Sequence, residues 1–192
     1  MSEMLEIRWH GRGGQGAKTA SILLAKIAAA GGKHIQAFPE YGPERMGAPV
    51  LAYTRISGHK IYKHCQVEYP DLVCVLDSTL IGTIDVTANL KENGKLIINS
   101  RKSPTEIREA FGFAEQVKIY TLDADKISEE EIGRVFPNTP LLGAVNVVAE
   151  LLPEKDFINK AEKQFLHKFS GKQELITGNL DAVKRAMQAV NS

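Results

Sequence analysis

The stretch LEIRWHGRGGQGAKTASILLAKIAAAGG, residues 5–32, decides the fold. Residues 5–10 form a short run rich in apolar side chains, which predicts a β-strand. Residues 11–16 are mostly glycine and predict a loop, because glycine tolerates backbone conformations that other residues avoid. Residues 17–30 predict a helix that is apolar, and therefore buried, on more than one side. Gly31-Gly32 ends this helix, as glycine commonly does after a C-cap.

Further strand-like runs lie at residues 33–38, 71–77, 95–99 and 117–122. The first strand, helix and second strand make a βαβ unit, which indicates a parallel or mixed sheet covered by helices. Residues 49–56 and 60–66 predict a β-hairpin around Ser57-Gly58-His59. The last part, about residues 139–192, keeps apolar residues at helical spacing. We therefore predict one α/β domain over residues 1–192, with three α/β/α layers, a Rossmann-like start and a helical C-terminal third.

Three polar residues predict where helices begin. Ser103, followed by Pro104, has the order of an N-cap and a first helical residue. Ser128 has a glutamate three residues later, which is the pattern of a capping box. Asn179 predicts the N-cap of a last helix over residues 180–190.

Composition excludes several classes of function. The 192 residues carry a net charge of +1, which gives no overall field for nucleic acid or for an anionic membrane surface. No run of 18 apolar residues predicts a membrane span. Two cysteines, Cys65 and Cys74, are too few for an iron–sulfur cluster or a four-cysteine zinc site. Residues 1–6 lack the pattern of a signal peptide, so we expect a cytoplasmic protein with reduced thiols.

The histidines do not predict a metal site. His59, His64 and Cys65 fall on or beside the predicted hairpin, with no further cluster of histidine or cysteine nearby. We expect these side chains to face solvent. His10 is expected to pack within the first strand, although contact with a ligand stays open because the glycine loop follows it. No set of residues predicts a self-sufficient catalytic centre.

The loop at residues 11–16 satisfies G-x-G-x-x-G between a strand and a helix. Such glycines let backbone N–H groups approach a phosphate, and the helix N-terminus adds partial positive charge. A nicotinamide site also needs an acidic residue at the end of the second strand, and the nearest one here, Glu40, lies beyond it. An NTPase P-loop needs a lysine directly after the last glycine, and Ala17 intervenes before Lys18. On spacing alone, a tight turn that binds no ligand remains open.

Three blocks of sequence point to one family. They are Gly11-Arg12-Gly13-Gly14-Gln15-Gly16, then Tyr41-Gly42-Pro43-Glu44-Arg45-Met46-Gly47-Ala48-Pro49-Val50, then Pro137-Asn138-Thr139 through Leu142-Gly143-Ala144. In order and spacing they resemble the gamma subunit of 2-oxoacid:ferredoxin oxidoreductases. The Gly-Ala-Pro-Val ending of the second block is most similar to the pyruvate and branched-chain branches. Met46 departs from the basic residue that many relatives carry, which weakens an anion-binding role there.

The resemblance implies a multisubunit enzyme that converts pyruvate, coenzyme A and oxidised ferredoxin to acetyl-CoA, CO₂ and reduced ferredoxin. A branched-chain 2-oxoacid in place of pyruvate is one alternative, and a stand-alone nucleotide-binding Rossmann-like module is another. The family's thiamine diphosphate and iron–sulfur clusters would lie on partner chains, which the family names alpha, beta and delta. No cofactor would be bound by this chain alone, which agrees with its two cysteines.

The resemblance also implies roles for two of the blocks, neither of them catalytic. The first block would hold a phosphate of coenzyme A through Gly11, Arg12, Gly13, Gly14, Gln15 and Gly16. The second would form an interface loop with partner subunits through Tyr41, Gly42, Pro43, Glu44 and Arg45. We also expect apolar surface for these partners on the helices at residues 17–30 or 141–152.

Overall fold

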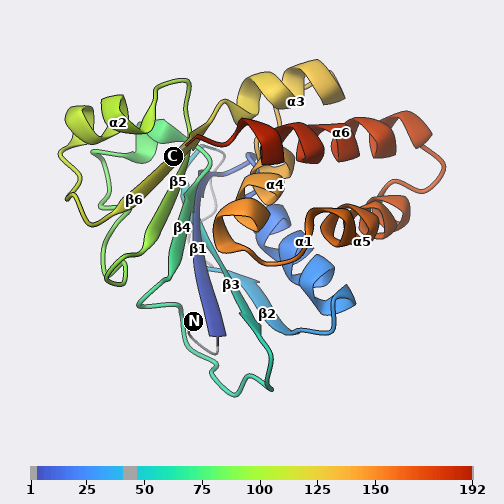
Figure 1. Cartoon of the computed structure of the whole chain (residues 1–192), viewed down its shortest axis with the longest axis horizontal. Helices are drawn as coiled ribbons and strands as arrows, with labels where there is room; N and C mark the ends of the chain where they lie inside the picture. The colour runs from blue at the N-terminus through green and yellow to red at the C-terminus, as the bar shows by residue number, and fades with distance from the viewer. Residues whose placement is uncertain (1–3, 41–46, 192) are drawn as a thin grey trace.

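The computed structural model describes residues 4–40 and 47–191. A six-stranded sheet runs through the centre, in the order β2-β3-β1-β4-β5-β6 (Figure 1). Its strands are β1 (Met4–Arg12), β2 (His34–Pro39), β3 (Pro49–Ser57), β4 (Leu72–Val75), β5 (Lys95–Asn99) and β6 (Lys118–Leu122). β1, β4, β5 and β6 are parallel, whereas β3 is antiparallel to both β1 and β2. The mixed sheet that the sequence predicts is therefore confirmed.

Helices cover both faces of the sheet (Figure 1). They are α1 (Ala17–Ala30), α2 (Pro104–Phe111), α3 (Ala124–Ile132), α4 (Asn138–Ala149), α5 (Glu154–Lys168) and α6 (Gln173–Ala189), with a 3-10 turn η1 (Ser78–Leu80) after β4. The larger hydrophobic core joins α1, α4, α5 and α6 to one sheet face. The smaller core lies on the other face, where Ile107 of α2 packs against β4, β5 and β6. The α/β class, its layers and the helical C-terminal third are as predicted.

Successive side chains of β1 point to opposite faces of the sheet, and the two faces differ in polarity. Ile7 and Trp9 enter the larger core. Trp9 Nε1 donates to Thr54 Oγ1 of β3 at 2.9 Å, and Thr54 Oγ1 donates to the carbonyl of Ser21 in α1 at 3.1 Å. This chain of hydrogen bonds joins β1, β3 and α1 inside the protein. The intervening residues of β1 point to the opposite face, because side chains alternate along a strand.

The opposite face of β1 and β3 carries buried charge. Glu6 Oε1 pairs with Arg55 Nε at 2.8 Å, and both side chains are buried. The guanidinium of Arg55 also donates to the carbonyls of Cys65 and Gln66 at 2.8 and 2.9 Å. These bonds hold the segment after β3 in an irregular path over Arg55. The hairpin predicted for residues 49–56 and 60–66 is therefore wrong, and β3 pairs instead with β1 and β2.

Two of the three predicted caps are also wrong. Ser103 caps α2 with a complete capping box, as predicted. α3 begins earlier than predicted, because Asp123 caps it, and Ser128 lies inside the helix. α6 begins at Gln173, and Asn179 is buried in its interior, where its Oδ1 accepts from Thr139 Oγ1 at 2.9 Å.

The expected apolar surface on α1 and α4 is largely absent from the described residues. Both helices pack within the chain, and Leu24 and Leu141 have no solvent exposure. Val147, at 41% exposure, is a large exposed hydrophobic side chain on α4. Gly143 lets α4 approach α6, because a Cβ there would collide with the backbone of Val183. None of the helices within residues 4–40 and 47–191 is long and apolar enough to span a bilayer.

Candidate functional site

The glycine loop, residues 11–16, connects the C-terminal end of β1 to the start of α1. Gly14 and Gly16 have φ angles of +98° and +87°, which L side chains adopt only with strain. A Cβ on Gly16 would also lie 2.9 Å from the Cγ atom of Asn138 at the start of α4. Gly16 is therefore required by its own backbone and by the close approach of α4.

Gln15 holds the loop in its shape. Its Oε1 accepts from the backbone N–H of Arg12 at 2.7 Å, and its Nε2 donates to Asp77 Oδ2 at 2.7 Å. Asp77 follows β4, the parallel neighbour of β1. The Gln15 side chain therefore ties the loop to the carboxyl end of the next strand, the edge where ligands bind in open α/β sheets.

Arg12 is engaged with the protein itself. Its Nε lies 3.1 Å from Asp77 Oδ2, and its Nη1 donates to the carbonyl of Gly47 at 3.2 Å. Its Nη2 donates to Thr79 Oγ1 at 2.9 Å. Because Asp77 compensates its charge, Arg12 is better placed to position the loop than to supply a free positive charge.

Asp77 is kept ionised by its neighbours. Burial alone would raise its pKa, but hydrogen bonds from Thr79 and Gln15 and the charge of Arg12 outweigh burial, so the pKa is lowered. Asp77 Oδ1 also accepts from the backbone N–H of Thr79 at 2.9 Å, which caps η1. The same carboxylate therefore caps η1 and anchors the glycine loop.

The second sequence block, residues 41–50, contacts the glycine loop through Gly47 and Ala48. Gly13 N–H donates to the carbonyl of Ala48 at 2.9 Å, and Gly47 N–H donates to the carbonyl of Gly13 at 3.2 Å. Two blocks that are separate in sequence are thus joined by backbone hydrogen bonds. The predicted interface residues Tyr41, Gly42, Pro43, Glu44 and Arg45 lie outside the described residues.

A hollow of about 590 Å³ opens beside the loop, on the sheet face that α1, α4, α5 and α6 cover. We call it the helix-start hollow, because α1, α4 and α6 begin at it and their first turns contribute Thr19, Thr139 and Leu175 to its lining. None of these three helices has a side-chain hydrogen bond from its N-cap residue within the described structure. The remaining lining includes the cationic side chains of Arg134, Lys168 and Lys172. Uncapped helix N-termini and cations together favour an anion.

A second hollow, of about 540 Å³, lies on the opposite face of β1 and β3. We call it the His10 hollow, after the buried histidine in its lining. Its polar lining residues are Arg8, His10, Glu40, Tyr53 and Asp85, and Ala48, Pro49, Val50, Leu51, Ile84 and Ala88 complete it. Burial, reinforced by the nearby charge of Arg8, lowers the pKa of His10 to about 3, so His10 is neutral at physiological pH.

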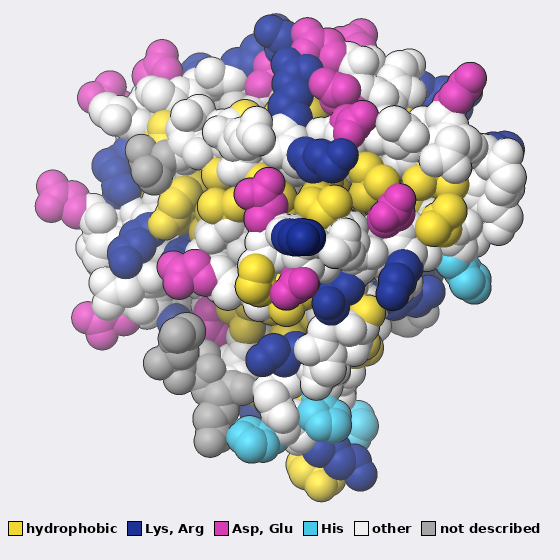
Figure 2. All heavy atoms as spheres, turned by 45° about the vertical axis from the view of Figure 1, so that its right-hand side comes forward, with side chains coloured by type: hydrophobic (Ala, Val, Ile, Leu, Met, Phe, Trp, Pro, Cys, Tyr) yellow, Lys and Arg dark blue, Asp and Glu magenta, His cyan; other side chains and the backbone are white. Residues whose placement is uncertain are grey.

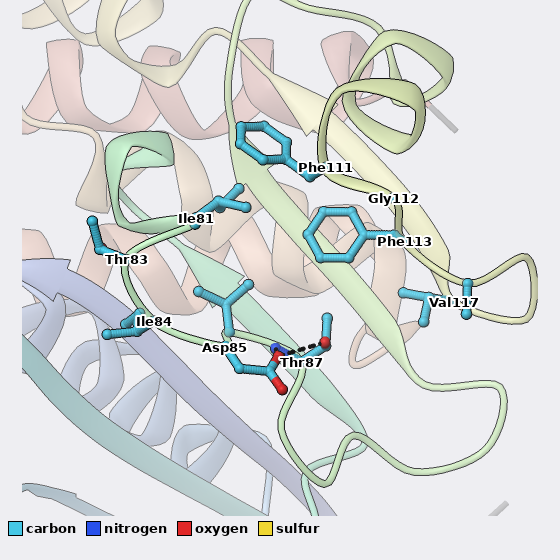
Figure 3. Close-up of a pocket in the computed structure, with 12 residues that line it drawn as sticks. Ile81, Thr83, Ile84, Asp85, Thr87, Phe111, Gly112, Phe113 and Val117 are labelled. Atoms are coloured by element: carbon cyan, nitrogen blue, oxygen red, sulfur yellow. Dashed lines mark hydrogen bonds between the residues drawn. The ribbon is translucent and has the colours of Figure 1, made fainter.

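A third hollow, of about 450 Å³, lies across the segment at residues 81–87 from the His10 hollow. Figure 3 shows Phe111, Phe113, Ile81 and Ile84 around it, with Asp85 turned to Thr87. Asp85 Oδ1 accepts from the backbone N–H and the hydroxyl of Thr87 at 2.9 and 2.8 Å. These bonds fix the wall that separates the two hollows.

The described residues contain no group of three or more His, Cys, Asp or Glu side chains placed to hold a metal ion. Cys65 is exposed, and Cys74 is buried inside β4. Burial raises the pKa of the Cys74 thiol, which makes it a poor nucleophile. Figure 2 shows acidic and basic side chains interspersed over one face of the molecule, with a band of hydrophobic side chains between them.

Comparison with known proteins identifies the family. A family model described as pyruvate ferredoxin/flavodoxin oxidoreductase matches residues 6–189. The chain belongs to this family. Pyruvate synthase subunit PorC of Thermotoga maritima is 44% identical over 185 residues, which cover 96% of this chain and 94% of that protein. The common gamma subunit of the pyruvate/ketoisovalerate oxidoreductases of Thermococcus litoralis is 43% identical over 96% of each chain.

A solved structure agrees over the whole length. The crystal structure of pyruvate oxidoreductase subunit PORC from Thermotoga maritima has a TM-score of 0.84 and 41% identity to this chain. The alignment covers 99% of this chain and 98% of that one. The resemblance drawn from the three sequence blocks is therefore confirmed, and the chain is a gamma-type subunit of the pyruvate ferredoxin/flavodoxin oxidoreductase family.

The structure brings together more than the sequence predicted. Gly11 to Gly16 form one loop, as expected, but its partners Asp77 and Thr79 come from the end of β4. The sequence hinted at the His10 hollow only through the alternation of polar residues in β1, which places Arg8 and His10 on one face. Nothing in the sequence pairs that face with Glu40 and Tyr53.

Proposed function

We propose that this chain is the gamma subunit of an enzyme complex that oxidatively decarboxylates pyruvate with coenzyme A and ferredoxin. The observation that carries the proposal is full-length likeness, in sequence and in structure, to proteins named pyruvate synthase subunit PorC and pyruvate oxidoreductase subunit PORC. On its own the chain would not turn over substrate. It would act in the cytoplasm, within the assembled enzyme.

The identity of the 2-oxoacid is a separate part of the proposal. Some similar relatives are named as a gamma subunit common to pyruvate and ketoisovalerate oxidoreductases. A shared subunit supports the idea that other subunits select the substrate side chain. A branched-chain 2-oxoacid is therefore the alternative substrate for the complex that contains this chain.

The partners we propose are alpha, beta and delta subunits, with ferredoxin as the electron acceptor of the complex. Thiamine diphosphate and iron–sulfur clusters would lie on those partners. The cysteine count supports this division, because the chain has two cysteines and cluster ligation normally uses four. Cys74 lies inside β4, which leaves Cys65 as the exposed thiol.

For the glycine loop, we propose that it binds a phosphate of coenzyme A. The loop forms one wall of the helix-start hollow through Gly14 and Gly16, and the first turn of α1 follows directly. The cationic side chains of Arg134, Lys168 and Lys172 line the same hollow. Arg12 supports the site indirectly, because its bonds to Asp77 and Gly47 hold the loop in place.

Co-purification tests the assembly. An affinity-tagged version of this chain, expressed in its native host, should co-purify with larger subunits. The eluate should show the visible absorbance of iron–sulfur clusters. The isolated chain should show no oxidation of pyruvate. A colourless eluate that contains this chain alone and binds nucleotides tightly would instead favour the stand-alone nucleotide-binding module.

Binding of coenzyme A to the assembled complex tests the phosphate site. Lys172→Gln should weaken the binding of coenzyme A and of 3′,5′-ADP by about three- to tenfold, since one charged contact contributes about 1 kcal/mol. Lys163→Gln is the matched control, because Lys163 is exposed on α5 and does not line the hollow. Equal affinities for both variants and the wild type would refute the phosphate site. An unchanged affinity in Arg12→Ala would show that Arg12 has no part in it.

A further inference from the structure

The two edges of the central sheet differ in how the chain covers them. Figure 1 shows β6 at one end of the sheet and β2 at the other. At the β6 edge, the N–H and the carbonyl of Thr121 both pair with Asn191 at 3.0 Å, so the C-terminal segment covers part of that edge. At the β2 edge, β3 is the only strand that pairs with β2 within the described residues.

The register of β2 shows which of its backbone groups face outward. Directly after β2, the N–H of Glu40 donates to the carbonyl of Leu51 at 2.9 Å, in the same register as the strand pair. Residues that bond to the neighbouring strand alternate with residues that do not in an antiparallel ladder. The even-numbered residues of β2 therefore bond to β3, and the backbone groups of Ile35, Ala37 and Pro39 face away from it. The outward position suits Pro39, which has no N–H to donate.

The outward edge of β2 is open to another strand. The N–H and carbonyl groups of Ile35 and Ala37 have no hydrogen bond within residues 4–40 and 47–191. Edge strands are usually protected by charged side chains, bulges or covering segments. The six residues of β2 include no Lys, Arg, Asp or Glu, and their pairing with β3 contains no bulge. The side chain of Ile35 adds exposed apolar surface, at 36% exposure.

A cationic segment lies beside this edge. We use that name for residues 58–66, which follow β3, contain Lys60, Lys63 and two histidines, and contain no acidic residue. All nine residues except Ile61 are exposed. Gln36 Nε2 donates to the carbonyl of Lys63 at 2.6 Å, which fixes the segment next to the middle of β2. Figure 2 shows histidine and basic side chains gathered at the lowest part of the molecule.

The charges of the cationic segment are incompletely compensated by the chain. The side chain of Lys63 is 55% exposed and lies 3.8 Å from Glu6 Oε1, which Arg55 already binds at 2.8 Å. Lys60 has no ion pair in the described part of the chain, and its Nζ lies 5.3 Å from the ring centroid of Tyr62. Tyr62 is 76% exposed, and tyrosine is enriched at protein interfaces. The segment therefore suits a protein surface that carries carboxylates.

Charge also decides against a second copy of this chain at the β2 edge. Between two antiparallel copies, the register with most hydrogen bonds pairs Ile35 of one copy with Ala37 of the other. That register places Gln36 of both copies on the two-fold axis. Because Lys63 is bonded to Gln36, the two cationic segments would then face each other. Like charges placed opposite each other are destabilising.

We propose that the β2 edge binds an extended acidic segment of a partner subunit as a seventh strand. The backbone of that segment would pair with Ile35 and Ala37, and its carboxylates would lie against Lys60 and Lys63. Addition of a strand to an open sheet edge is a common mode of protein recognition. The proposal rests on the proposed function, which supplies the partner subunits, and it adds where and how one of them binds.

Hydrogen exchange resolved to single residues tests the backbone pairing. The amides of Ile35 and Ala37 should exchange freely in the isolated full-length chain. In the assembled complex they should exchange about 100-fold more slowly, since strand pairing protects amides. The amides of Gln36 and Phe38 bond to β3 and should be slow in both samples. Exchange of Ile35 and Ala37 that is as fast in the complex as in the isolated chain would overturn the proposal.

Two substitutions of Ala37 separate its outward N–H from the rest of the residue. Ala37→Pro removes that N–H without removing a bond to β3, and Pro39 already occupies an equivalent position in the same strand. Ala37→Ser is the matched control, because it keeps the N–H and a small side chain. Thermal unfolding verifies that each variant folds.

Competition within the cell measures the effect of these variants. Each variant is co-expressed with the wild-type chain in the native host, and mass spectrometry gives the ratio of the two in the purified complex. Ala37→Pro should be under-represented by about tenfold, the effect of one lost hydrogen bond. Ala37→Ser should be incorporated as well as the wild type. Equal incorporation of Ala37→Pro would contradict the strand pairing.

Charge reversal in the same competition tests the acidic character of the partner segment. Lys60→Glu should be under-represented by about threefold or more, because it places a carboxylate against carboxylates. Lys163→Glu is the control, since Lys163 is exposed on α5. If both variants are incorporated equally, the partner segment is not acidic at this point and the proposal is wrong.

Three results separate this inference from the proposed function. A chain that co-purifies with no other subunit would refute the proposed function, and this inference with it. A complex that forms while Ile35 and Ala37 exchange freely would refute this inference alone. Protection of these amides in the isolated chain that increases with protein concentration would show a second copy at the edge, which also overturns the inference.

Discussion

The side-chain amide of Gln15 donates to Asp77 Oδ2 at 2.7 Å, and so joins the glycine loop to the end of β4. The same side chain accepts from the backbone N–H of Arg12. One residue therefore fixes both the internal turn of the loop and its position against the sheet. This explains why a polar residue lies among the glycines of the first sequence block.

Removing this side chain should destabilise the protein. Gln15→Ala leaves the N–H of Arg12 without its acceptor and removes one of the two donors to Asp77 Oδ2, the other being Arg12 Nε. The loss should lower the free energy of unfolding by about 1–3 kcal/mol. Urea denaturation measures the loss. Gln188→Ala is a control, because Gln188 is exposed on α6. If Gln188→Ala lowers the free energy of unfolding by the same amount, the bond from Gln15 to Asp77 does not account for the effect of Gln15→Ala.

Asp77 should make stability depend on acid pH. Its pKa in the folded chain is lowered from the ordinary value of 3.8, so the unfolded chain binds this proton more readily. The stabilisation is therefore complete above pH 3.8 and is lost as the pH falls through the lower folded pKa. Asp77→Asn should reduce stability at pH 7 and flatten the acid limb of a pH–stability curve below pH 4. A variant whose acid limb stays as steep as the wild type's would contradict this role.

His10 should contribute a second pH dependence of the same sign over a different range. Its pKa is lowered to about 3 in the folded chain, from 6.5 when unperturbed. Between these values the unfolded chain is protonated at this histidine and the folded chain is not, so stability falls as the pH is lowered from 6.5 towards 3. His10→Gln should reduce the slope of unfolding free energy against pH by the equivalent of up to one bound proton. Chemical denaturation at several pH values measures that slope. An unchanged slope between pH 6 and 4.5 would mean that His10 takes up its proton in the folded chain.

Two glycines of the loop should differ in their tolerance of a methyl group. Gly14→Ala meets open space and carries only the strain of its positive φ, about 1–2 kcal/mol. Gly16→Ala carries that strain and also a contact with the Asn138 side chain, where its Cβ would lie 2.9 Å from Cγ. We expect Gly16→Ala to cost about 2–4 kcal/mol. Thermal unfolding of the two variants gives the comparison, and equal losses would show that Asn138 moves away freely.

The sequence alone predicted those helices and strands that are determined by residues close together in the chain. The helix over Ala17–Ala30 is decided by its continuous apolar sequence and its terminal glycines, and the capping box at Ser103 needs only residues of its own first turn. Lys95–Asn99 is a buried strand whose short apolar run is bounded by polar residues. For these segments, tertiary contacts reinforce what the sequence prefers.

The wrong predictions arise where distant residues outweigh local preference. Asn179 has the character of an N-cap, but Thr139 from α4 provides a buried partner inside α6. Ser128 is likewise taken into α3, where its hydroxyl accepts from the N–H of Phe136. Residues 60–66 have strand character, yet Arg55 binds their last carbonyls and holds them off the sheet.

The candidate site divides in the same way. The glycine pattern locates the loop, because positive φ angles demand glycine. The identity of its anchor, Asp77, depends on β1 and β4 being neighbours, and the sheet order that makes them so is not encoded in either strand. The His10 hollow depends in addition on β3 lying beside β1, so no local motif could reveal it.

Trp9 is the single tryptophan of the chain. Its ring is fully buried, and its N–H bonds to Thr54, which bonds in turn to Ser21. Its intrinsic fluorescence is therefore a built-in reporter of one event, the joining of β1, β3 and α1. A fluorescence transition that precedes the far-ultraviolet circular dichroism transition during refolding would show that this N-terminal unit assembles before the C-terminal helices.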